Sequence, residues 1–484
     1  MSIRTSVAWT FSEQFLQYGI QLAASVIIAR LLTPDEMGVF ALAMSASAIL
    51  TSLRTFGIGN YLIREPELTL DKIRSAFGVM LVISWSLGLA LFLLRDLIAG
   101  IYERPDIADV ISLISLNFFV APFGAPAFSM LTREMRFQAL HNIGLATSAT
   151  GSFVSVALAY SGASYMALAW GLLTTSFLHA ICCMAIMPRY ALLWPSFVHW
   201  RKITHFGGLL AVSSLFGTVN SEGITFFLGV FINPAAVAQF NRAVQVPSLL
   251  RQGIFGPISR VLTPAWSKDV RDGRSIGPAA EKLTALNTAI VWPPFLALSL
   301  ISVPFIVLVF GPNWQPAGEI FPWVLLSNAV LAMLPQPEQV LVPHGQVGRV
   351  FTVRSVGVLI SLALTAYAAP LGLNAFAISR VVISVIFLTL IFFAVKSVIE
   401  FKLGTYVKLY LRSAVIAVVA SIPAAVFHFT GRESMTLPEL LLIVASCAVL
   451  WLLGIALTRH FIWQEVLSLG RHLLDRLKQS RTKR

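Results

Sequence analysis

The sequence predicts an all-α, polytopic membrane protein of about fourteen transmembrane helices, each of about 20 residues. Two observations favour this fold class. Hydrophobic residues make up 57% of the 484-residue chain and charged residues only 12%, about half the roughly 25% of a soluble domain. Apolar runs of spanning length also alternate with short polar breaks along the whole sequence. This composition excludes a soluble enzyme, a disordered protein and a secreted disulfide scaffold, and we interpret the three cysteines as small hydrophobic residues.

The first expected span contains glutamate and glutamine and lacks the clean apolar core and small-residue cleavage site of a signal peptide. We therefore expect it to stay in the mature protein. The expected spans cover residues 8–30, 38–60, 76–98, 107–130, 141–160, 164–187, 205–232, 236–260, 283–311, 318–342, 349–369, 373–395, 408–429 and 437–461.

The orientation follows from the lysines and arginines of the short loops, which favour the cytoplasmic side. With both termini cytoplasmic, the outer side keeps only Arg30, Arg95, Arg104 and Arg432. We therefore attribute the net charge of +13 to membrane topology rather than to nucleic-acid binding. The basic tail, residues 463–484, suits either a helix on the cytoplasmic leaflet or a disordered end.

A weak internal repeat relates residues 31–40 to residues 231–240, each joining one expected span to the next. The matched pairs are Pro34 with Pro234, Gly38 with Ala238, and Phe40 with Phe240. An even number of spans in each half predicts two six-helix lobes related by an axis along the membrane normal. We expect lobes at residues 1–200 and 201–400, two additional helices at 401–462 and the basic tail at 463–484.

Polar side chains at helical spacing mark two expected spans at equivalent places in the halves. The first span carries Gln14, Gln17, Gln21 and Ser25. The other carries Ser213, Ser214, Gly217, Asn220, Ser221 and Thr225. Both faces suit cavity walls, since polar groups within a membrane avoid lipid. Helix–helix packing through small and polar residues is the alternative.

Four arginines lie within expected spans: Arg54, Arg242, Arg251 and Arg380. Arg54 and Arg251 occupy nearly corresponding places toward the cytoplasmic side, and Arg242 and Arg380 lie nearer the outer face. Because guanidinium binds phosphate oxygens in pairs, two such levels suit a phosphate-bearing substrate. The alternatives are snorkelling to the nearer interface and pairing with an acid. The acids within expected spans are Glu13, Glu222, Glu319 and Glu338, of which Glu13 and Glu222 are candidates for binding a coupling ion.

Motifs of other classes are absent from the sequence. There is no Gly-x-x-x-x-Gly-Lys-Ser/Thr phosphate loop, no His-Glu-x-x-His and no Cys-x-x-Cys. We therefore expect no metal, no cofactor, no catalytic residue and no enzymatic activity.

Three segments resemble polysaccharide flippases, the Wzx-type translocators of lipid-linked oligosaccharides in the multidrug/oligosaccharidyl-lipid/polysaccharide superfamily. They are residues 29–40, residues 57–64 with Gly57, Gly59 and Arg64, and residues 133–137 from Arg133 to Phe137. Residues 238–243 are similar to the Gly-x-Tyr-x-x-Ala motif of that family, with alanine for glycine and phenylalanine for tyrosine. The resemblance is strongest to the exopolysaccharide branch, such as succinoglycan.

The resemblance implies a MATE- and MurJ-like fold that works by alternating access in the bacterial inner membrane. The implied substrate is a polyprenyl-diphosphate-linked oligosaccharide destined for exopolysaccharide or lipopolysaccharide, with a polymerase and a chain-length regulator as further partners. On this hypothesis Arg54 and Arg251 engage the diphosphate from the cytoplasmic side. Arg242 and Arg380 form a second binding position for it nearer the outer face. Gln14, Gln17, Gln21 and Asn220 would then hydrogen-bond sugar hydroxyls.

Three other functions compete with this one. A multidrug exporter of the same superfamily would favour carboxylates over arginines in its cavity. A lipid II flippase would also carry two extra helices and a cationic cavity, and it would be essential for growth. A membrane scaffold for a polymerase complex would have no reason to keep arginines within its spans.

Overall fold

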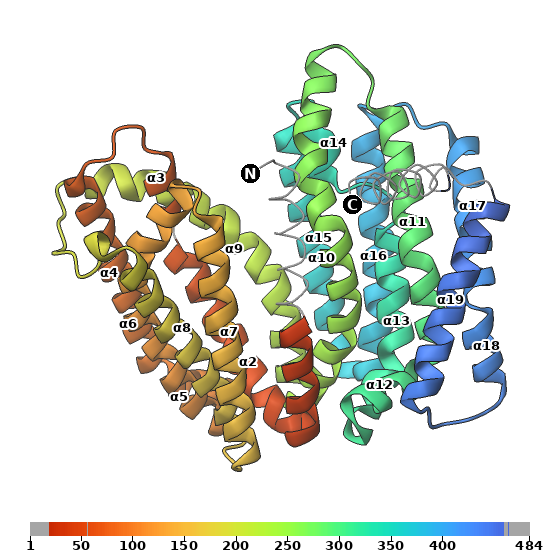
Figure 1. Cartoon of the computed structure of the whole chain (residues 1–484), viewed down its shortest axis with the longest axis horizontal. Coiled ribbons are helices and arrows are strands. Elements are labelled where there is room, and N and C mark those ends of the chain that lie inside the picture. The colour runs from red at the N-terminus through yellow and green to blue at the C-terminus, as the bar shows by residue number, and fades with distance from the viewer. Residues whose placement is uncertain (1–18, 56, 459–462, 464–484) are drawn as a thin grey trace, which may run out of the picture. The chain divides into compact units, whose positions relative to one another are not determined.

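The computed structural model describes residues 19–55, 57–458 and 463, and all of its regular secondary structure in these ranges is helical (Figure 1). Helix Gly19–Leu31 precedes α2. The first part of the chain then forms α2 (Pro34–Thr55), α3 (Ile58–Arg64), α4 (Leu70–Leu93), α5 (Arg95–Ile101), α6 (Asp106–Arg133), α7 (Phe137–Tyr160), α8 (Met166–Ile186), the 3-10 turn η1 (Pro188–Tyr190) and α9 (Trp200–Phe231).

The second part continues with α10 (Pro234–Arg271), α11 (Gly277–Leu300), α12 (Ser302–Phe310), η2 (Pro312–Trp314), α13 (Gln315–Leu331), α14 (Pro337–Leu341), α15 (Val347–Ala368), η3 (Ala369–Leu371), α16 (Leu373–Lys396), α17 (Leu403–Ala420), α18 (Ile422–Phe429) and α19 (Leu437–Leu457). Within the described residues, ten helical stretches are long and apolar enough to cross a membrane. The all-α membrane fold is confirmed, and the count of about fourteen spans stays a prediction.

Two compact units divide the chain, Met1–Gln239 and Phe240–Arg484. The observed boundary between the units follows residue 239, later than the expected lobe boundary at residue 200. The reason is that α9 packs along α2 and contacts α3 and α4 in the first unit. The boundary by packing therefore lies within α10. The lobes at 1–200 and 201–400 are inferred from the internal repeat and stay a prediction about that repeat. They do not describe which helices pack together.

The two repeat segments have the same local structure. Pro34 is the first residue of α2 and Pro234 the first residue of α10. Proline suits this position because its missing N–H is one that the first turn of a helix leaves unpaired anyway. Gly38 lies directly against the Pro234 backbone, where an added Cβ would come 1.9 Å from the carbonyl oxygen.

The first unit has a core between α3, α4, α6 and α8, closed by Ile203 of α9. Small residues let its helices approach closely: Gly124 of α6 faces the Ala180 backbone of α8, and Gly151 of α7 faces Gly171 of α8. Cys183 is fully buried in this core, as expected of a small hydrophobic residue.

The second unit is built on α11, α13, α16 and α17, with cores around Trp266 and Ala297. Thr288 and Ser413 join α11 to α17 through a buried hydroxyl hydrogen bond of 2.8 Å. The expected span at 318–342 is shorter than predicted, since α13 ends at Leu331 and Gln336–Gln339 form a capping box that starts α14. Glu338, expected within a span, therefore lies in a short separate helix, where it pairs with Arg354.

Candidate functional site

A break in the second span positions the candidate site in the first unit. Helix α2 ends at Thr55 and α3 begins at Ile58, with Gly57 between them in the left-handed conformation at φ 59°. Glycine adopts this conformation without the steric cost that other residues have. Arg54 consequently lies in the last turn of α2, directly before the break.

Helix α6 is opened opposite this break by a proline. Pro122 has no N–H, so the carbonyl of Phe118, four residues earlier, loses its partner within the helix. Ser84 of α4 replaces that partner and donates to the Phe118 oxygen at 2.5 Å. Trp85 Nε1 donates to the next carbonyl, that of Phe119, at 3.2 Å. A proline within the membrane is tolerated here because side chains of the neighbouring helix satisfy the freed backbone.

The break and the opened turn border a pocket of about 320 Å³ in the first unit. Its polar lining comes from Arg54, Asn60, Ser84 and Ser129, and its lining residues include no acid. The volume lies at the lower end of the range for ligand pockets. An arginine with hydroxyl and amide groups, and no competing carboxylate in the lining, suits an anionic, hydrogen-bonding group.

Arg54 is held loosely at the edge of this pocket. Its guanidinium carbon lies 5.1 Å from the centre of the Phe118 ring, and Nη1 lies 3.5 Å from the Asn117 carbonyl oxygen. The side chain is half-buried and has no ion pair with a described residue. Toward the described residues, most of its donors thus remain available, as the sequence-based hypothesis for this arginine requires.

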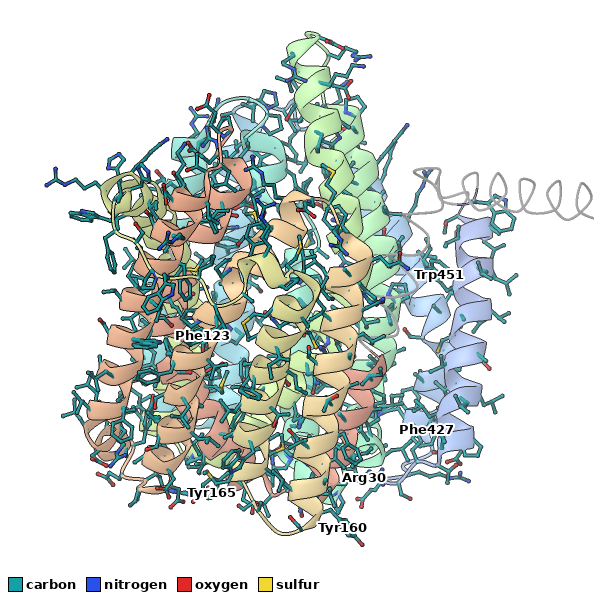
Figure 2. The ribbon with its side chains drawn as sticks, turned by 60° about the vertical axis from the view of Figure 1, so that its left-hand side comes forward. Arg30, Phe123, Tyr160, Tyr165, Phe427 and Trp451 are labelled. Carbon is teal, nitrogen blue, oxygen red and sulfur yellow. The ribbon has the colours of Figure 1, made fainter. Side chains whose placement is uncertain are left out.

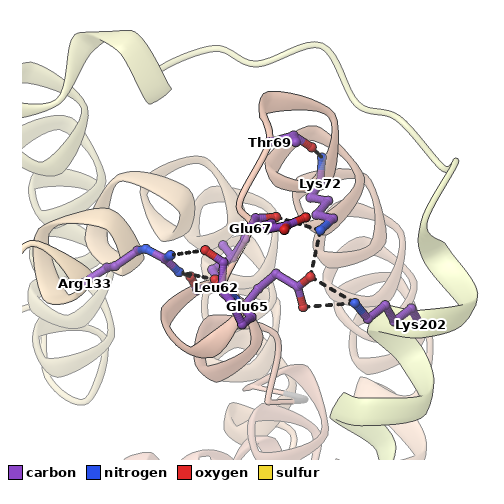
Figure 3. Close-up of polar contacts among 8 residues, drawn as sticks. Leu62, Glu65, Glu67, Thr69, Lys72, Arg133 and Lys202 are labelled. Atoms are coloured by element: carbon purple, nitrogen blue, oxygen red, sulfur yellow. Dashed lines mark hydrogen bonds and ion pairs between the residues drawn. The ribbon is translucent and has the colours of Figure 1, made fainter.

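Arg133 fixes the end of α3 on the side away from Gly57. Its Nη1 donates to the carbonyls of Leu62 at 2.8 Å, Ile63 at 3.2 Å and Glu65 at 2.7 Å, and its Nη2 donates to Pro66 at 3.3 Å. Leu62 and Ile63 lie in the last turn of α3, whose carbonyls lack intrahelical partners, and Glu65 and Pro66 directly follow the helix. Figure 3 shows this cap beside the Glu65 cluster. The segment beginning at Arg133, one of those that carry the family resemblance, therefore has a structural role.

Replacing Arg133 with Ala is expected to lower the free energy of unfolding by about 2–3 kcal/mol, because charge-assisted bonds to several carbonyls are lost together. Lysine should restore only part of this, since one ammonium cannot reach all four acceptors. Thermal unfolding of the purified protein in detergent measures the change. Arg136→Ala, an exposed neighbour, is the matched control and should stay within about 0.5 kcal/mol. Equal stability of both variants would contradict the role of the cap.

Glu65 joins three elements on the same side of the unit (Figure 3). Its carboxylate accepts from Lys72 Nζ of α4 at 2.7 Å and from Lys202 Nζ of α9 at 2.9 Å. Lys202 Nζ also lies 6.0 Å from the centre of the Tyr61 ring. The hydrogen bonds from Lys72 and then Lys202 hold the pKa of Glu65 below its ordinary value of 4.5.

The stabilisation from Glu65 should therefore depend on pH. A carboxyl whose pKa is lowered by folding stabilises the folded state above its unfolded pKa, and the effect is lost as pH falls through the lowered value. We expect Glu65→Gln to unfold at a lower temperature than wild type at pH 7, with the difference closing as pH falls below 4.5. Thermal unfolding across this range measures it. For Glu67→Gln a much smaller difference is expected, since Glu67 bonds Lys72 through its backbone carbonyl and its carboxylate acts on Lys202 only as a nearby charge. A pH-independent gap for Glu65→Gln would refute the assignment.

The predicted polar faces are described only in part. Glu13, Gln14 and Gln17 lie outside the described residues, as do the side chains of Ser213 and Ser214. Gln21 is exposed in helix Gly19–Leu31. Asn220 lies on α9, and its Oδ1 is buried without a hydrogen-bond partner among the described residues, which suits a polar ligand or water.

Glu222 follows on α9, where Ser45 of α2 donates to its backbone carbonyl at 3.3 Å and Ser221 lies 3.4 Å from its carboxylate. The Ser45 bond joins α2 to α9, as helix packing through polar residues requires, and cavity lining by this face stays a prediction. Among the described residues no group of three or more histidines, cysteines and acids could hold a metal ion.

The three candidate arginines of the second unit differ in environment. Arg242 is buried, with its guanidinium 5.2 Å from the Phe310 ring and 5.1 Å from the Trp314 ring, and it donates to Gln245 at 2.6 Å. Arg380 donates to the buried Ser361 at 3.1 Å. Arg251 is exposed on α10. Arg242 is thus occupied by aromatic rings, whereas Arg251 and Arg380 keep exposed surface.

Comparison with known proteins identifies the family. A family profile described as "Polysaccharide biosynthesis protein" matches residues 27–319, which are 293 of the 484 residues. The chain belongs to this family. The predicted resemblance to polysaccharide flippases is thereby confirmed.

Three relatives of this chain have names that refer to polysaccharide biosynthesis or transport. The succinoglycan biosynthesis transport protein ExoT of Rhizobium meliloti is 23% identical, over 68% of this chain and 67% of its own. The lipopolysaccharide biosynthesis protein WzxC of Escherichia coli is 24% identical over 65% of each chain. The teichuronic acid biosynthesis protein TuaB of Bacillus subtilis is 22% identical, over 90% of this chain and 92% of its own. The chain thus spans about two thirds of the first two relatives and nearly all of the third.

Solved structures confirm the fold class. The lipid II flippase MurJ in an inward closed conformation matches with a TM-score of 0.75 at 14% identity, over 94% of this chain and 99% of that one. An inward-facing multidrug MATE transporter matches with a TM-score of 0.58 at 12% identity, over 79% of this chain and 95% of that one. At such identities the likeness concerns the fold alone, and this multi-pass membrane protein has the predicted MATE- and MurJ-like fold.

Proposed function

We propose that this protein is a flippase for a polyprenyl-diphosphate-linked oligosaccharide in the bacterial inner membrane. It moves its substrate from the cytoplasmic to the periplasmic leaflet by alternating access, for exopolysaccharide or lipopolysaccharide assembly. Both termini lie in the cytoplasm. The observation that carries the proposal is the Arg54 pocket, a cationic and hydrogen-bonding site without acidic lining, in a member of a polysaccharide biosynthesis family.

The substrate assignment combines the pocket with the names of the relatives. Transport of succinoglycan material is stated for ExoT and lipopolysaccharide biosynthesis for WzxC. Such polymers are built from sugar units whose lipid carrier bears phosphate, and guanidinium is the side chain that binds phosphate oxygens in pairs. Arg54 therefore engages the diphosphate from the cytoplasmic side, together with Arg251.

The remaining candidates take the roles that their positions suit. Arg380 provides an outer station for the diphosphate, and Arg242 joins it only in a conformation that releases it from Phe310 and Trp314. Gln14, Gln17, Gln21 and Asn220 hydrogen-bond sugar hydroxyls. Glu13 and Glu222 bind a coupling ion. A polysaccharide polymerase and a chain-length regulator receive the product.

Deleting the gene tests the function directly. We expect lipid-linked oligosaccharide to accumulate in the inner leaflet and surface polymer to be lost, with both restored by the wild-type gene. Unchanged polymer and intermediate, in a strain without a redundant transporter, would overturn the proposal. Resistance to cationic dyes on overproduction would point instead to a multidrug exporter, and loss of viability would point to a lipid II flippase.

A further inference from the structure

A second pocket, of about 470 Å³, lies in the first unit between α4, α6 and the connector 188–199 that links α8 to α9. All of its lining residues are apolar, and five are aromatic: Phe77, Trp85, Phe123, Trp194 and Phe197. The rings of Phe77 and Trp85 lie 6.0 and 6.5 Å from that of Phe123. The indole N–H of Trp85 donates to the Phe119 carbonyl, and the indole of Trp194 is the one other polar group on the lining side chains. The pocket therefore suits a hydrocarbon chain rather than a polar ligand.

The connector 188–199 is fixed to α4 by its backbone. Ser196 N donates to the Arg74 carbonyl at 3.1 Å, and Arg74 Nε donates to the Trp194 carbonyl at 3.0 Å. Gly78 allows the close approach, since an added Cβ would lie 2.4 Å from the Ser196 oxygen. Hydrogen bonds to α4 therefore hold the connector in place, and the pocket is formed before a ligand binds.

The composition around the connector is that of a membrane interface. Leu192, Trp194 and Val198 are each more than three quarters exposed, which is unfavourable in water. Arg189 and Arg201 flank them and are exposed, and residues 187–202 contain no acid. Tryptophan and basic residues mark the headgroup level of a bilayer, and basic clusters there attract anionic lipids.

The pocket extends from this level into the depth of one leaflet. Its α4 lining runs from Phe77 to Trp85, about 12 Å along a helix, which is less than half of the roughly 30 Å hydrocarbon core. Figure 2 shows Phe123 at mid-height of the first-unit helices and Tyr160 and Tyr165 at their lower ends. One acyl chain of a phospholipid would thus reach from the basic connector to the middle of the membrane.

The occupant is distinct from the cargo bound near Arg54. Met80 and Ser84 line the Arg54 pocket, whereas Phe77, Leu81 and Trp85 line the apolar one, so the two pockets use different faces of α4. Between them, hydrogen bonds from Ser84 and Trp85 tie α4 to α6. We propose that the apolar pocket and the connector 188–199 form a binding site for an anionic phospholipid of the surrounding leaflet, with one acyl chain in the pocket and the headgroup beside Arg189 and Arg201.

Native mass spectrometry of the full-length protein, titrated with phosphatidylglycerol or with phosphatidylcholine of the same chains, tests this site. We expect tighter binding of phosphatidylglycerol, weakened about tenfold by Val82→Trp, which fills the pocket, and by the double variant Arg189→Gln, Arg201→Gln. The matched controls, Leu89→Trp on an exposed part of α4 outside the pocket and Arg95→Gln at the α5 start, should bind as wild type does.

Three results would overturn the proposal. Equal binding of the two phospholipids would contradict a headgroup site for anionic lipid. Equal weakening of binding by the control variants would contradict binding in the pocket. Displacement of phosphatidylglycerol by equimolar undecaprenyl phosphate would assign the pocket to the tail of the cargo. Because binding is read without transport, these outcomes are independent of the flippase assay, and an unchanged unfolding temperature verifies that each variant folds.

Discussion

Arg54→Ala and Arg251→Ala are each expected to abolish transport of the lipid-linked oligosaccharide, whereas the lysine variants should keep part of it. Each guanidinium offers a pair of charge-assisted bonds to a phosphate, and losing bonds of about 1.5–3 kcal/mol each lowers flux by roughly 100-fold or more. Lysine keeps the charge but not the planar fork. Surface polymer and accumulated intermediate in a complemented deletion strain measure the effect.

Arg432→Ala is the matched control for these two variants. Arg432 pairs with Glu439 at an exposed site outside the Arg54 pocket, so its loss should leave flux within about twofold of wild type. Immunoblotting of membranes verifies equal amounts of each variant. Wild-type flux in either Arg54→Ala or Arg251→Ala, at normal protein level, would disprove the role of that arginine.

The largest expected loss of stability comes from replacing Gly38 with valine. A Cβ at this position would come 1.9 Å from the carbonyl oxygen of Pro234 and 2.8 Å from its Cα, and backbone atoms cannot turn aside as a flexible side chain can. Overpacking of this kind costs about 1–3 kcal/mol. Because the contact is with backbone atoms, we take the upper end of this range, less the about 1 kcal/mol by which alanine favours a helix. We therefore expect Gly38→Ala to lower the unfolding free energy by about 2 kcal/mol, and Gly38→Val to prevent accumulation of folded protein.

Gly144→Ala separates the packing effect from helix propensity. Gly144 lies within α7 with nothing within 4 Å of an added Cβ, so alanine should stabilise the protein by up to about 1 kcal/mol. Thermal unfolding in detergent compares the two variants. A stabilising Gly38→Ala would show that α2 and the start of α10 do not pack as the structure has them.

Much of the fold could be predicted from local sequence. Prolines at 34 and 234 mark the starts of α2 and α10, and apolar length identifies most of the long helices. Helix starts and helix lengths depend on residues that are close together in the sequence, so the sequence pattern predicts them. The unit boundary does not follow in this way, because it depends on α9 packing against α2.

The sequence singles out Arg54 but not the way its pocket is built, and the binding role of Arg54 stays a prediction. A mid-span arginine is visible in the sequence, and Arg54 lines a pocket as the hypothesis requires. The same argument treated Arg242 alike, yet Phe310 and Trp314, far along the chain, surround it. The partnership of Ser84 with the carbonyl freed by Pro122 was missed. A proline within a span is a local clue to an unpaired carbonyl, but its partner lies on another helix.

Transport by the purified protein tests the central claim most directly. Lipid-linked oligosaccharide is incorporated into proteoliposomes that contain wild-type protein, Arg54→Ala or no protein, and its exposure on the outer surface is followed with a membrane-impermeant oxidant of sugars. The account predicts that wild-type protein makes the protected inner pool accessible over time, while Arg54→Ala behaves as protein-free liposomes do. An inner pool that stays protected with folded wild-type protein under an imposed membrane potential and ion gradients would contradict it.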